Sequence, residues 1–448
     1  MTPDELKSQR VLIIGAGVTG VSVMKYLSQH AIAFDVTDSK SDAPESTRQL
    51  IGQGRYIAGL NSIDPSQYDV MILSPGIPRA HPMVVAAVRA GIPVIGDVEL
   101  FAAVTSCDVI AITGSNGKST VASMAAHVLQ SAGRDVVLCG NIGTAVLDVL
   151  PRNPSTVVGD APICVLELSS YQLESLHRLA PVSATVLNVS NDHLDRYESI
   201  EHYAATKRAV YRQASHCVAN HDDVRTHPEN SSTEHSWFSL TDASAKFHTA
   251  IVNDSTALCI DGDCVLMANE LCLPGEHNIA NALAVMALLH PFKLSTVELK
   301  QGLSSFRGLQ HRLELVTFRK GVRWFNDSKG TNVDACMKAV KAMPGPVILI
   351  AGGQGKGADF SPLRTVVAEH VKALLLMGED APLLRSALDG ATELMEVESM
   401  QAAVTLADKV AVSGDVVLLS PACASFDMFE NYMARGREFC VSVEQLAA

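Results

Sequence analysis

A glycine-rich turn between an apolar run and a predicted helix constrains the fold of this chain more than any other feature. The turn reads Thr-Gly-Ser-Asn-Gly-Lys-Ser-Thr at 113–120, after an apolar run at 109–113 and before a helix predicted over 121–130. A strand, a glycine turn and a helix in this order aim backbone N–H groups and a helix N-terminus at one point, which suits a phosphate. Lys118 would then reach the β- and γ-phosphates, and Ser119 or Thr120 would offer a hydroxyl to Mg²⁺.

The turn is a shortened variant of the usual phosphate loop. The usual motif has a glycine five residues before its second glycine, and Ile112 occupies that place here. A structural corner with a chance Gly-Lys-Ser is the alternative interpretation. The strand-turn-helix context favours an ATP-binding site built around Gly114, Gly117 and Lys118.

Length and charge bound the remaining possibilities. A chain of 448 residues is too long for one core and predicts about three domains. Its 35 Lys and Arg residues against 48 Asp and Glu residues give a net charge of −13. This balance disfavours a nucleic-acid or anionic-membrane surface, so we expect neither partner.

The cysteines and the N-terminus indicate a reduced cytoplasmic protein. The ten cysteines include no C-x-x-C pair, so neither zinc nor a disulfide framework is expected. The first ten residues are polar and carry Asp4 and Glu5, which is unlike a signal peptide. No apolar run reaches the ~18 residues of a membrane-spanning helix, so we expect no membrane insertion.

The first predicted domain, residues 1–96, carries a dinucleotide-type fingerprint. Residues 15–20 read Gly-Ala-Gly-Val-Thr-Gly, after a strand at 11–14 and before a helix from about Val21. A second strand at 31–36 ends near Asp38, where an acid would meet a ribose hydroxyl. The motif specifies a pyrophosphate at a helix N-terminus, so NAD, a UDP-sugar and a purely structural turn all remain open.

A second turn of this domain reads Ser-Pro-Gly at 74–76, after a strand at 69–73. It lies at the carboxyl end of a parallel strand, where α/β proteins bind ligands. A plain Pro/Gly turn is the alternative.

The second predicted domain, residues 97–307, holds the phosphate loop and three further candidates. Glu167 lies near the carboxyl end of a buried strand at 163–168, and an acid beside a phosphate loop is a natural Mg²⁺ ligand. His193 follows a strand at 184–189 and is either structural or a ligand. Lys207 lies in a helix predicted over 200–213, and the pattern alone indicates a solvated helix lysine.

The rest of this domain changes character. Alternating segments at 246–252 and 257–267 predict β-hairpins that form an antiparallel appendage. A helix then runs through His290. Its Asn278 and Asn281 share one face, where they could hydrogen-bond an adenine edge or cap the helix.

The third predicted domain, residues 308–448, returns to alternating strands and helices. Polar turns follow its predicted strands at 326–331, 352–357 and 420–425. Carboxyl ends of parallel strands meet at one edge, so we expect these turns to form a site there. The turn at 352–357 has Lys356 but no Ser or Thr after it, so it need not bind a second nucleotide.

The chemistry that these pieces allow is positioning and charge neutralisation, as in phosphoryl transfer. The sequence shows neither a nucleophile elbow nor a metalloprotease motif. Three domains suggest three substrates.

Four motifs, in their order and spacing, resemble the signature of the Mur ligases, ATP-dependent amide ligases of peptidoglycan precursor synthesis. They lie at 113–120, 167–172, 191–196 and 275–281. Five further segments resemble the branch of that family that adds D-glutamate to UDP-N-acetylmuramoyl-L-alanine. They lie at 15–20, 74–76, 308–312, 327–331 and 420–425.

The resemblance implies an α/β fold of three domains. The N-terminal domain would be Rossmann-like and bind UDP. A P-loop-type central ATPase domain with an antiparallel β appendage and a Rossmann-like C-terminal domain that binds the amino acid would follow. It implies a monomeric cytoplasmic ligase that uses ATP and Mg²⁺, with two ions expected, and an acyl-phosphate intermediate.

The resemblance also implies roles for particular residues. The catalytic set is Lys118, Glu167, His193 and Lys207. The ATP-binding set is Gly114, Asn116, Gly117, Lys118, Ser119, Thr120, Asn278, Asn281, His311, Arg312 and Asp327. The set for the UDP substrate is Val18, Thr19, Asp38, Ser39, Ser74, Gly76 and Asn141. The D-glutamate set is His193, Lys329, Thr331, Lys356, Ser425 and Tyr432. The Mg²⁺ set is Thr120, Glu167, His193 and Lys207, the last as a carbamate.

Three competing interpretations remain. An NAD-dependent oxidoreductase explains residues 15–20 and Asp38 but leaves Lys118 and Glu167 unexplained. A non-catalytic nucleotide-binding protein would keep the glycine-rich loops, but it would not need Glu167, His193 and Lys207 together. A sibling ligase that adds another amino acid is the nearest alternative.

Overall fold

The computed structural model describes the chain except for residues 61–62, 151–160, 191–195, 230–233 and 447–448. The chain forms two compact units. The first holds Met1–Met267 and Ala280–Leu303, and the second holds Ala268–Ile279 and Ser304–Ala448. Among the described helices, none is long and apolar enough to cross a lipid bilayer.

The first unit begins with a five-stranded parallel sheet in the order β3-β2-β1-β4-β5. Its strands are β1 (Val11–Ile14), β2 (Phe34–Asp38), β3 (Tyr56–Ala58), β4 (Val70–Leu73) and β5 (Val94–Ile95). Its helices are α1 (Pro3–Leu6), α2 (Val18–Gln29), α3 (Glu45–Leu50) and α4 (Pro82–Arg89).

Alternate residues of β1 enter different buried clusters, which shows that helices cover both faces of this sheet. Ile13 belongs to the cluster that contains Val23 of α2, whereas Ile14 belongs to the cluster that contains Val84 of α4. A strand buried on both faces reads as a continuous apolar run, and Val-Leu-Ile-Ile is such a run. The predicted Rossmann-like N-terminal fold is confirmed.

The same unit continues with a nine-stranded sheet in the order β14-β13-β12-β11-β10-β9-β6-β8-β7. Its strands are β6 (Val109–Thr113), β7 (Val136–Gly140), β8 (Ile163–Glu167), β9 (Ser183–Val186), β10 (His216–Asn220), β11 (Glu234–Ser239), β12 (Phe247–Val252), β13 (Ser255–Ile260) and β14 (Asp263–Met267). The helices that follow in the chain are α5 (Asp97–Ala102), α6 (Lys118–Ser131), α7 (Ser170–Leu173), α8 (Ile200–Arg208), α9 (Glu276–Leu289) and α10 (Thr296–Ser305).

The predicted antiparallel hairpins are present and extend this sheet at one edge. β12 pairs in parallel with β11, while β13 pairs antiparallel with both β12 and β14. The tight turn at 261–262 has positive φ at both residues, which suits its Asp-Gly sequence.

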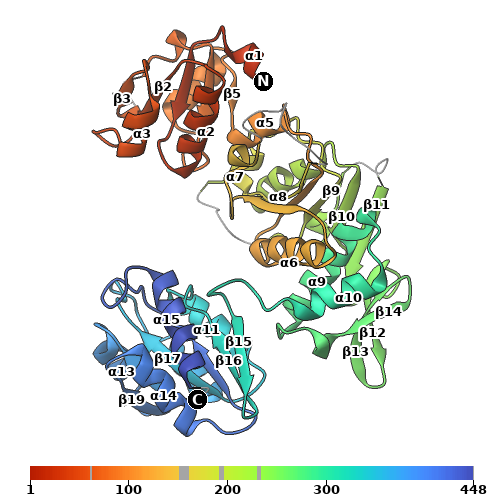
Figure 1. Cartoon of the computed structure of the whole chain (residues 1–448), viewed down its shortest axis with the longest axis vertical. Helices are drawn as coiled ribbons and strands as arrows, with labels where there is room; N and C mark the ends of the chain where they lie inside the picture. The colour runs from red at the N-terminus through yellow and green to blue at the C-terminus, as the bar shows by residue number, and fades with distance from the viewer. Residues whose placement is uncertain (61–62, 151–160, 191–195, 230–233, 447–448) are drawn as a thin grey trace. The chain divides into compact units, whose positions relative to one another are not determined.

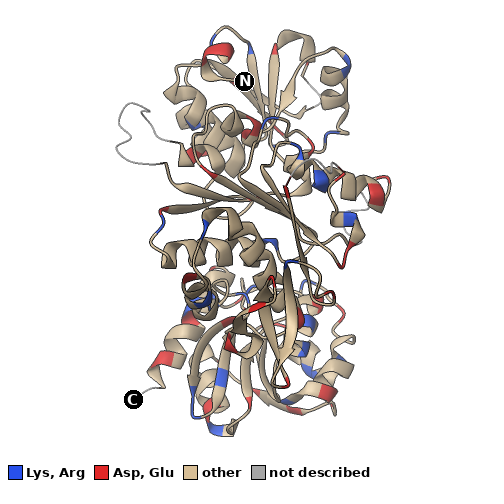
Figure 2. Ribbon diagram, turned by 90° about the vertical axis from the view of Figure 1, so that its right-hand side faces the viewer, with Lys and Arg blue, Asp and Glu red and all other residues tan. Residues whose placement is uncertain are grey.

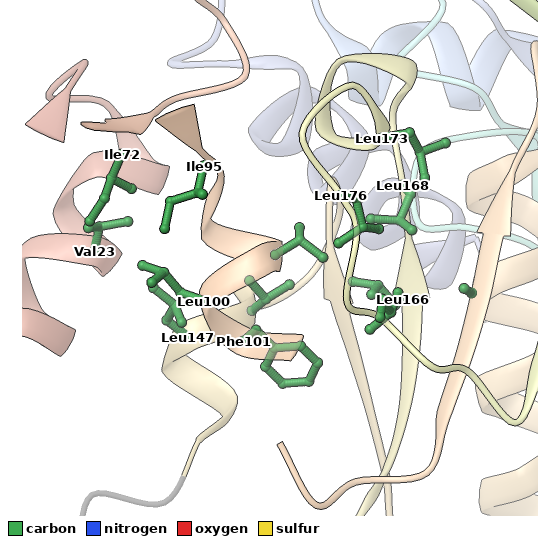
Figure 3. Packing of buried hydrophobic residues seen from close by; sticks show 14 of the residues in the cluster. Val23, Ile72, Ile95, Leu100, Phe101, Leu147, Leu166, Leu168, Leu173 and Leu176 are labelled. Carbon is green, nitrogen blue, oxygen red and sulfur yellow. The ribbon is translucent and has the colours of Figure 1, made fainter. Parts of the chain in front are cut away.

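One buried cluster continues from the five-stranded sheet into the nine-stranded one (Figure 3). Val23 and Ile72 lie beside Leu100 and Leu147 in this cluster, and Leu166 of β8 belongs to it as well. The two sheets of the first unit are therefore joined by a shared apolar core.

The second unit is a six-stranded sheet in the order β15-β16-β20-β17-β18-β19, with β15 antiparallel to its neighbour. Its strands are β15 (Glu314–Arg319), β16 (Val322–Asn326), β17 (Val347–Gly352), β18 (Val371–Met377), β19 (Glu393–Glu396) and β20 (Val416–Leu419). Its helices are α11 (Val333–Lys341), α12 (Leu363–His370), α13 (Ala381–Leu388), α14 (Met400–Val410) and α15 (Tyr432–Gln445).

The three polar turns of this unit leave one edge of its sheet, as predicted. β20 pairs in parallel with both β16 and β17, so the carboxyl ends of these three strands lie together. Figure 1 shows helices on both faces of this sheet, and Figure 2 shows acidic and basic residues interspersed along the elements of the chain.

Several predicted boundaries are wrong, and three of them have a clear local cause. α6 begins at Lys118, three residues before the first apolar residue, because the left-handed Gly117 already forms its N-cap. β2 begins at Phe34 and not at 31, since Ala31 adopts a left-handed conformation (φ 55°) that ends α2. α8 ends at Arg208, where the chain tightens into a 3₁₀ turn.

Candidate active site

The phosphate loop connects β6 to α6 and places Lys118 at the first position of the helix. Gly117, just before it, has a φ of 82°, a conformation that L side chains rarely adopt. Lys118 Nζ donates to the carbonyl oxygens of Gly114 at 2.8 Å and Ser115 at 2.9 Å. The amine thus lies across the loop, where a phosphate at the helix N-terminus would meet it. Ser119 and Thr120 follow in the first turn, half-buried.

Asn188, in the segment after β9, holds the loop in shape. Its Oδ1 accepts a hydrogen bond from Asn116 N at 2.8 Å, and its Nδ2 donates to Asn116 O at 3.1 Å. Ser115 N donates to the Asn188 carbonyl at 2.9 Å. The sequence analysis missed Asn188, which lies within the strand predicted over 184–189; a polar residue near the end of that apolar run was the available signal.

Lys207 contradicts the interpretation that the pattern alone gave. Its side chain is buried, with 1% of the residue exposed, and is not solvated. Its Nζ donates to Gly114 O at 2.8 Å and lies 4.5 Å from the centre of the Tyr203 ring. Helical periodicity places Lys207 among polar neighbours, but α8 turns this residue toward the phosphate loop. Two lysine amines therefore bond one carbonyl oxygen, an arrangement that favours a polyanion nearby.

Glu167 is the last residue of β8, beside β6, and is also buried. Asn141 Nδ2 donates to Glu167 Oε1 at 2.8 Å. Glu167 Oε2 is buried and has no hydrogen-bond partner among the described residues. A buried carboxylate oxygen without a partner is costly unless a cation or a donor from a ligand meets it.

The donor set fits Mg²⁺ as far as the structure describes it. Magnesium prefers hard oxygen ligands, and Glu167 and Thr120 offer a carboxylate and a hydroxyl. A lysine amine is no such ligand, so Lys207 could serve only as a carbamate. Within the described residues no group of three His, Cys, Asp or Glu is placed to hold a metal. His193 lies outside the described residues.

Asn278 and Asn281 of α9 are both buried. Asn281 Oδ1 faces the phosphate loop: a Cβ added at Gly117 would lie 2.7 Å from it. Asn278 Nδ2 donates to Pro274 O at 2.8 Å, at the start of the helix.

The N-terminal loop brings several of the predicted UDP-site residues together. Gly15 has a φ of 100°, and a Cβ on Gly20 would lie 1.9 Å from Gly15 O, so close approach requires glycine here. Asp38 Oδ2 accepts from Ala16 N at 2.7 Å, and Ser74 Oγ donates to Gly15 O at 3.3 Å.

The side chains around this loop remain accessible. Val18, the first residue of α2, is 82% exposed, and Ser39 and Gly76 are exposed too, whereas Thr19 is half-buried. Burial raises the pKa of Asp38, but hydrogen bonds from the backbone N–H groups of Ala16 and Lys40 outweigh it and hold this pKa below its ordinary value. The carboxylate is therefore charged at neutral pH.

In the second unit His311 and Asp327 lie buried at the ligand edge of the sheet, and Arg312 is exposed. Burial raises the pKa of Asp327 to about 7, although Ser420 Oγ donates to its Oδ2 at 2.7 Å. Burial also lowers the pKa of His311, whose Nδ1 lies 2.9 Å from Asn326 Nδ2.

Five of the predicted D-glutamate residues, Lys329, Thr331, Lys356, Ser425 and Tyr432, belong to the turns and the helix at this edge of the second unit. Lys329 Nζ lies 5.9 Å from the centre of the Tyr432 ring, which His311 meets edge-on at 6.3 Å. Ser425 is buried, and Thr331 is half-buried. Lys356 is exposed, and its Nζ lies 5.2 Å from the centre of the Phe426 ring. The sequence analysis missed a buried arginine, Arg435, beneath these turns.

Comparison with known proteins gives consistent matches over the chain. Three family models match: "Mur ligase MurD-like, N-terminal domain" over residues 9–96, "Mur ligase middle domain" over 112–289 and "Mur ligase, glutamate ligase domain" over 311–423. The chain belongs to the Mur ligase family.

Within that family, two curated relatives of high similarity carry the same name. UDP-N-acetylmuramoylalanine–D-glutamate ligase from Pseudoalteromonas translucida is 42% identical, over 98% of this chain and 99% of its own. The protein of the same name from Saccharophagus degradans is 40% identical over 98% of both chains.

Solved structures of similar fold are more distant in sequence. UDP-N-acetylmuramate–alanine ligase from Thermotoga maritima superposes with a TM-score of 0.55 at 18% identity, over 98% of this chain and 100% of that one. A UDP-N-acetylmuramoyl-L-alanyl-D-glutamate–2,6-diaminopimelate ligase superposes with a TM-score of 0.60 at 17% identity, over 86% of this chain and 95% of that one. These likenesses support the fold.

Proposed function

We propose that this chain is an ATP-dependent ligase that joins D-glutamate to UDP-N-acetylmuramoyl-L-alanine, with ADP and phosphate as the other products, in peptidoglycan precursor synthesis. The observation that carries the proposal is the phosphate loop, where Lys118 and Lys207 meet at Gly114 O. The names of relatives about 40% identical along almost the whole chain supply the two acids that are joined.

The reaction has two steps. The L-alanyl carboxylate attacks the γ-phosphorus of ATP, and ADP leaves, giving an acyl phosphate. The amine of D-glutamate then attacks the acyl carbonyl, and phosphate leaves. Lys118 stabilises the negative charge on the phosphate oxygens in the first step. Thr120, Glu167, His193 and carbamylated Lys207 would hold two Mg²⁺ ions, which neutralise charge on the transferring phosphate.

The substrates divide among three domains, 1–96, 97–307 and 308–448. The UDP end binds Val18, Thr19, Asp38, Ser39, Ser74 and Gly76, and Asn141 contacts the muramoyl group. The nucleotide binds the residues around Lys118 together with Asn278, Asn281, His311, Arg312 and Asp327. The two carboxylates of D-glutamate require cationic and hydroxyl donors, and we assign the D-glutamate site to His193, Lys329, Thr331, Lys356, Ser425 and Tyr432. The enzyme acts as a monomer in the cytoplasm, where ATP is available.

The test is phosphate release with ATP, Mg²⁺ and UDP-N-acetylmuramoyl-L-alanine, to which single amino acids are added. D-glutamate should give release, and L-glutamate, D-aspartate and glycine should not. Release with a different amino acid would keep the ligase and overturn the assignment of the D-glutamate residues. Absence of release with every amino acid, from folded protein that binds ATP, would overturn the ligase.

A further inference from the structure

Arg435 is one of the largest fully buried side chains of the chain, with 2% of the residue exposed. It lies in the first turn of α15, whose N-cap is Asn431. Arginine is rarely buried unless it is paired, because its charge must leave water. Its position therefore calls for an explanation.

The guanidinium joins two turns that follow different strands. Nε donates to Ser328 Oγ at 3.0 Å and Nη2 to Ser328 O at 2.8 Å, so the planar fork grips one residue of the turn after β16. Nη1 donates to Cys423 O at 3.1 Å and Ala424 O at 3.3 Å, in the turn after β20. Ser328 Oγ donates in turn to Tyr432 O at 2.8 Å, which ties the start of α15 to the same point.

All four acceptors are neutral oxygens. Among the described residues no carboxylate forms an ion pair with Arg435, and burial lowers its pKa to about 10, so it stays protonated at neutral pH. A buried cation without a direct ion pair is costly, although the charges of Asp427 and Asp327 offset part of the cost here. A dicarboxylate bound at this edge of the sheet would lower that cost.

Each element that Arg435 holds carries a residue proposed for D-glutamate. Lys329 follows Ser328, and Ser425 follows Ala424 directly in the chain. Tyr432 precedes Arg435 by three residues in α15 and so lies on a neighbouring part of the same helix face.

We infer that Arg435 is the positioning residue of the D-glutamate site: its guanidinium fixes the turn with Lys329 against the turn with Ser425. The inference rests on the proposed function. The fork geometry, and not the charge alone, performs this task, because a single amine cannot bond both turns as the planar fork does.

The test compares Arg435→Met and Arg435→Lys with Phe439→Leu. Phe439 is fully buried one turn further along α15 and packs on Trp324 in the apolar cluster, with ring centres 6.3 Å apart. Its replacement loosens the same helix without removing a bond to either turn, so it is a matched control. Melting curves of all three variants show that each is folded, and Arg435→Lys decides the matter if Arg435→Met does not fold.

Steady-state KM for each of the three substrates is the readout. A misplacement of about 1 Å can cost on the order of a hundredfold, so Arg435→Met should lower kcat/KM for D-glutamate by roughly that factor. The KM for UDP-N-acetylmuramoyl-L-alanine should stay within about twofold of wild type. Arg435→Lys should show the same selectivity with a smaller loss.

The inference is wrong if Arg435→Lys and Arg435→Met keep the wild-type KM for D-glutamate, or if Phe439→Leu raises it equally. Wild-type protein is assayed first. A wild type that releases no phosphate with D-glutamate contradicts the proposed function, whereas an active wild type with unaffected Arg435 variants contradicts only this inference.

Discussion

Two glycine-lysine turns of this chain look alike in sequence and differ in structure. Residues 114–119 read Gly-Ser-Asn-Gly-Lys-Ser, and 352–357 read Gly-Gly-Gln-Gly-Lys-Gly. Both follow a central strand of a parallel sheet. In the first turn Lys118 opens α6 at once, whereas α12 begins only at Leu363, seven residues after Lys356.

The glycines serve different purposes in the two turns. In the first, Gly117 supplies a left-handed N-cap that directs the helix N-terminus at the loop. In the second, a Cβ on Gly352 would lie 1.9 Å from Met377 O and one on Gly353 2.2 Å from Ala424 O, so glycine here allows strands and turns to approach closely. Of the two turns, only the first therefore directs the N-terminus of a helix at the position where a phosphate could bind.

The largest effect expected from this difference concerns the two lysines. Lys118→Ala should lower kcat/KM on the order of a thousandfold, since it removes a preorganised cation from the transferring phosphate. Lys356→Ala should leave ATP affinity within about twofold of wild type, and raise the KM for D-glutamate instead. Equilibrium binding of a fluorescent ATP analogue, together with phosphate release at varied D-glutamate concentration, distinguishes the effects of the two substitutions.

Unchanged α/β structure by circular dichroism is the control for both variants. A Lys356→Ala protein that loses ATP affinity as strongly as Lys118→Ala would show that both turns bind phosphate and would break the comparison.

The buried acid of the second unit predicts a pH effect. The pKa of Asp327 is raised by burial from 3.8 to about 7, so the folded state binds a proton that the unfolded state has released between these values. The free energy of unfolding should therefore fall as pH rises from about 4 to about 7, by up to about 4 kcal/mol, and then level off. Asp327→Asn should remove this loss, so the free energy of unfolding of the variant should rise relative to that of wild type between pH 5 and pH 8.

Tryptophan emission can measure this loss within the second unit. The chain has two tryptophans, and Trp324 lies buried in β16, three residues before Asp327 in the chain. Urea unfolding followed by Trp324 emission in a Trp237→Phe background thus reports on the unit that contains the acid. An equal pH dependence in wild type and Asp327→Asn would contradict the prediction.

The two turns can be compared directly by replacing one glycine in each, because these glycines have similar φ angles. Gly117 has a φ of 82° and Gly357 one of 77°, so Ala at either costs a similar strain of about 1–2 kcal/mol. A Cβ at Gly117 also meets Asn281 Oδ1 at 2.7 Å, while that at Gly357 meets nothing within 4 Å. Gly117→Ala should therefore destabilise by about 1–3 kcal/mol more than Gly357→Ala, measured by urea unfolding. Equal losses would show that the Asn281 contact costs nothing.

Much of the fold could be predicted because its strands are buried on both faces and read as apolar runs. The boundaries were less predictable, since they depend on single backbone conformations. Ala31 follows α2 in a left-handed conformation that is usually occupied by glycine. Because no glycine marks this position, the sequence did not indicate that β2 begins only at Phe34.

The candidate site could be predicted where it lies on local motifs. The order of strands, turns and helices along the chain locates both Lys118, after the glycine turn that follows β6, and Glu167, at the end of β8. In the structure Lys118 bonds the phosphate loop, and Glu167 lies on the strand next to β6. Asn188 and Arg435 act through contacts between segments distant in sequence, 72 and 107 residues apart. Their residue types alone, a polar residue after a strand and a cation on a helix, also fit solvated positions, so only the fold reveals them.

The smallest expected effect, a coupling of about 1 kcal/mol, concerns the carboxylate beside the first turn. Asn141→Ala removes the donor to Glu167 Oε1 and leaves a buried carboxylate whose Oε2 already has no partner among the described residues. The loss should be about 1–3 kcal/mol in the free energy of unfolding, because an unsatisfied buried charge bears its full desolvation cost. The same change in a Glu167→Gln background should cost about 1 kcal/mol less, since a neutral amide is cheaper to leave unpaired. A double-mutant cycle by urea unfolding measures this coupling. A coupling near zero would mean that Asn141 does not stabilise the charge of Glu167. The pairing of β8 with β6 would then be sufficient to position the acid beside the phosphate loop.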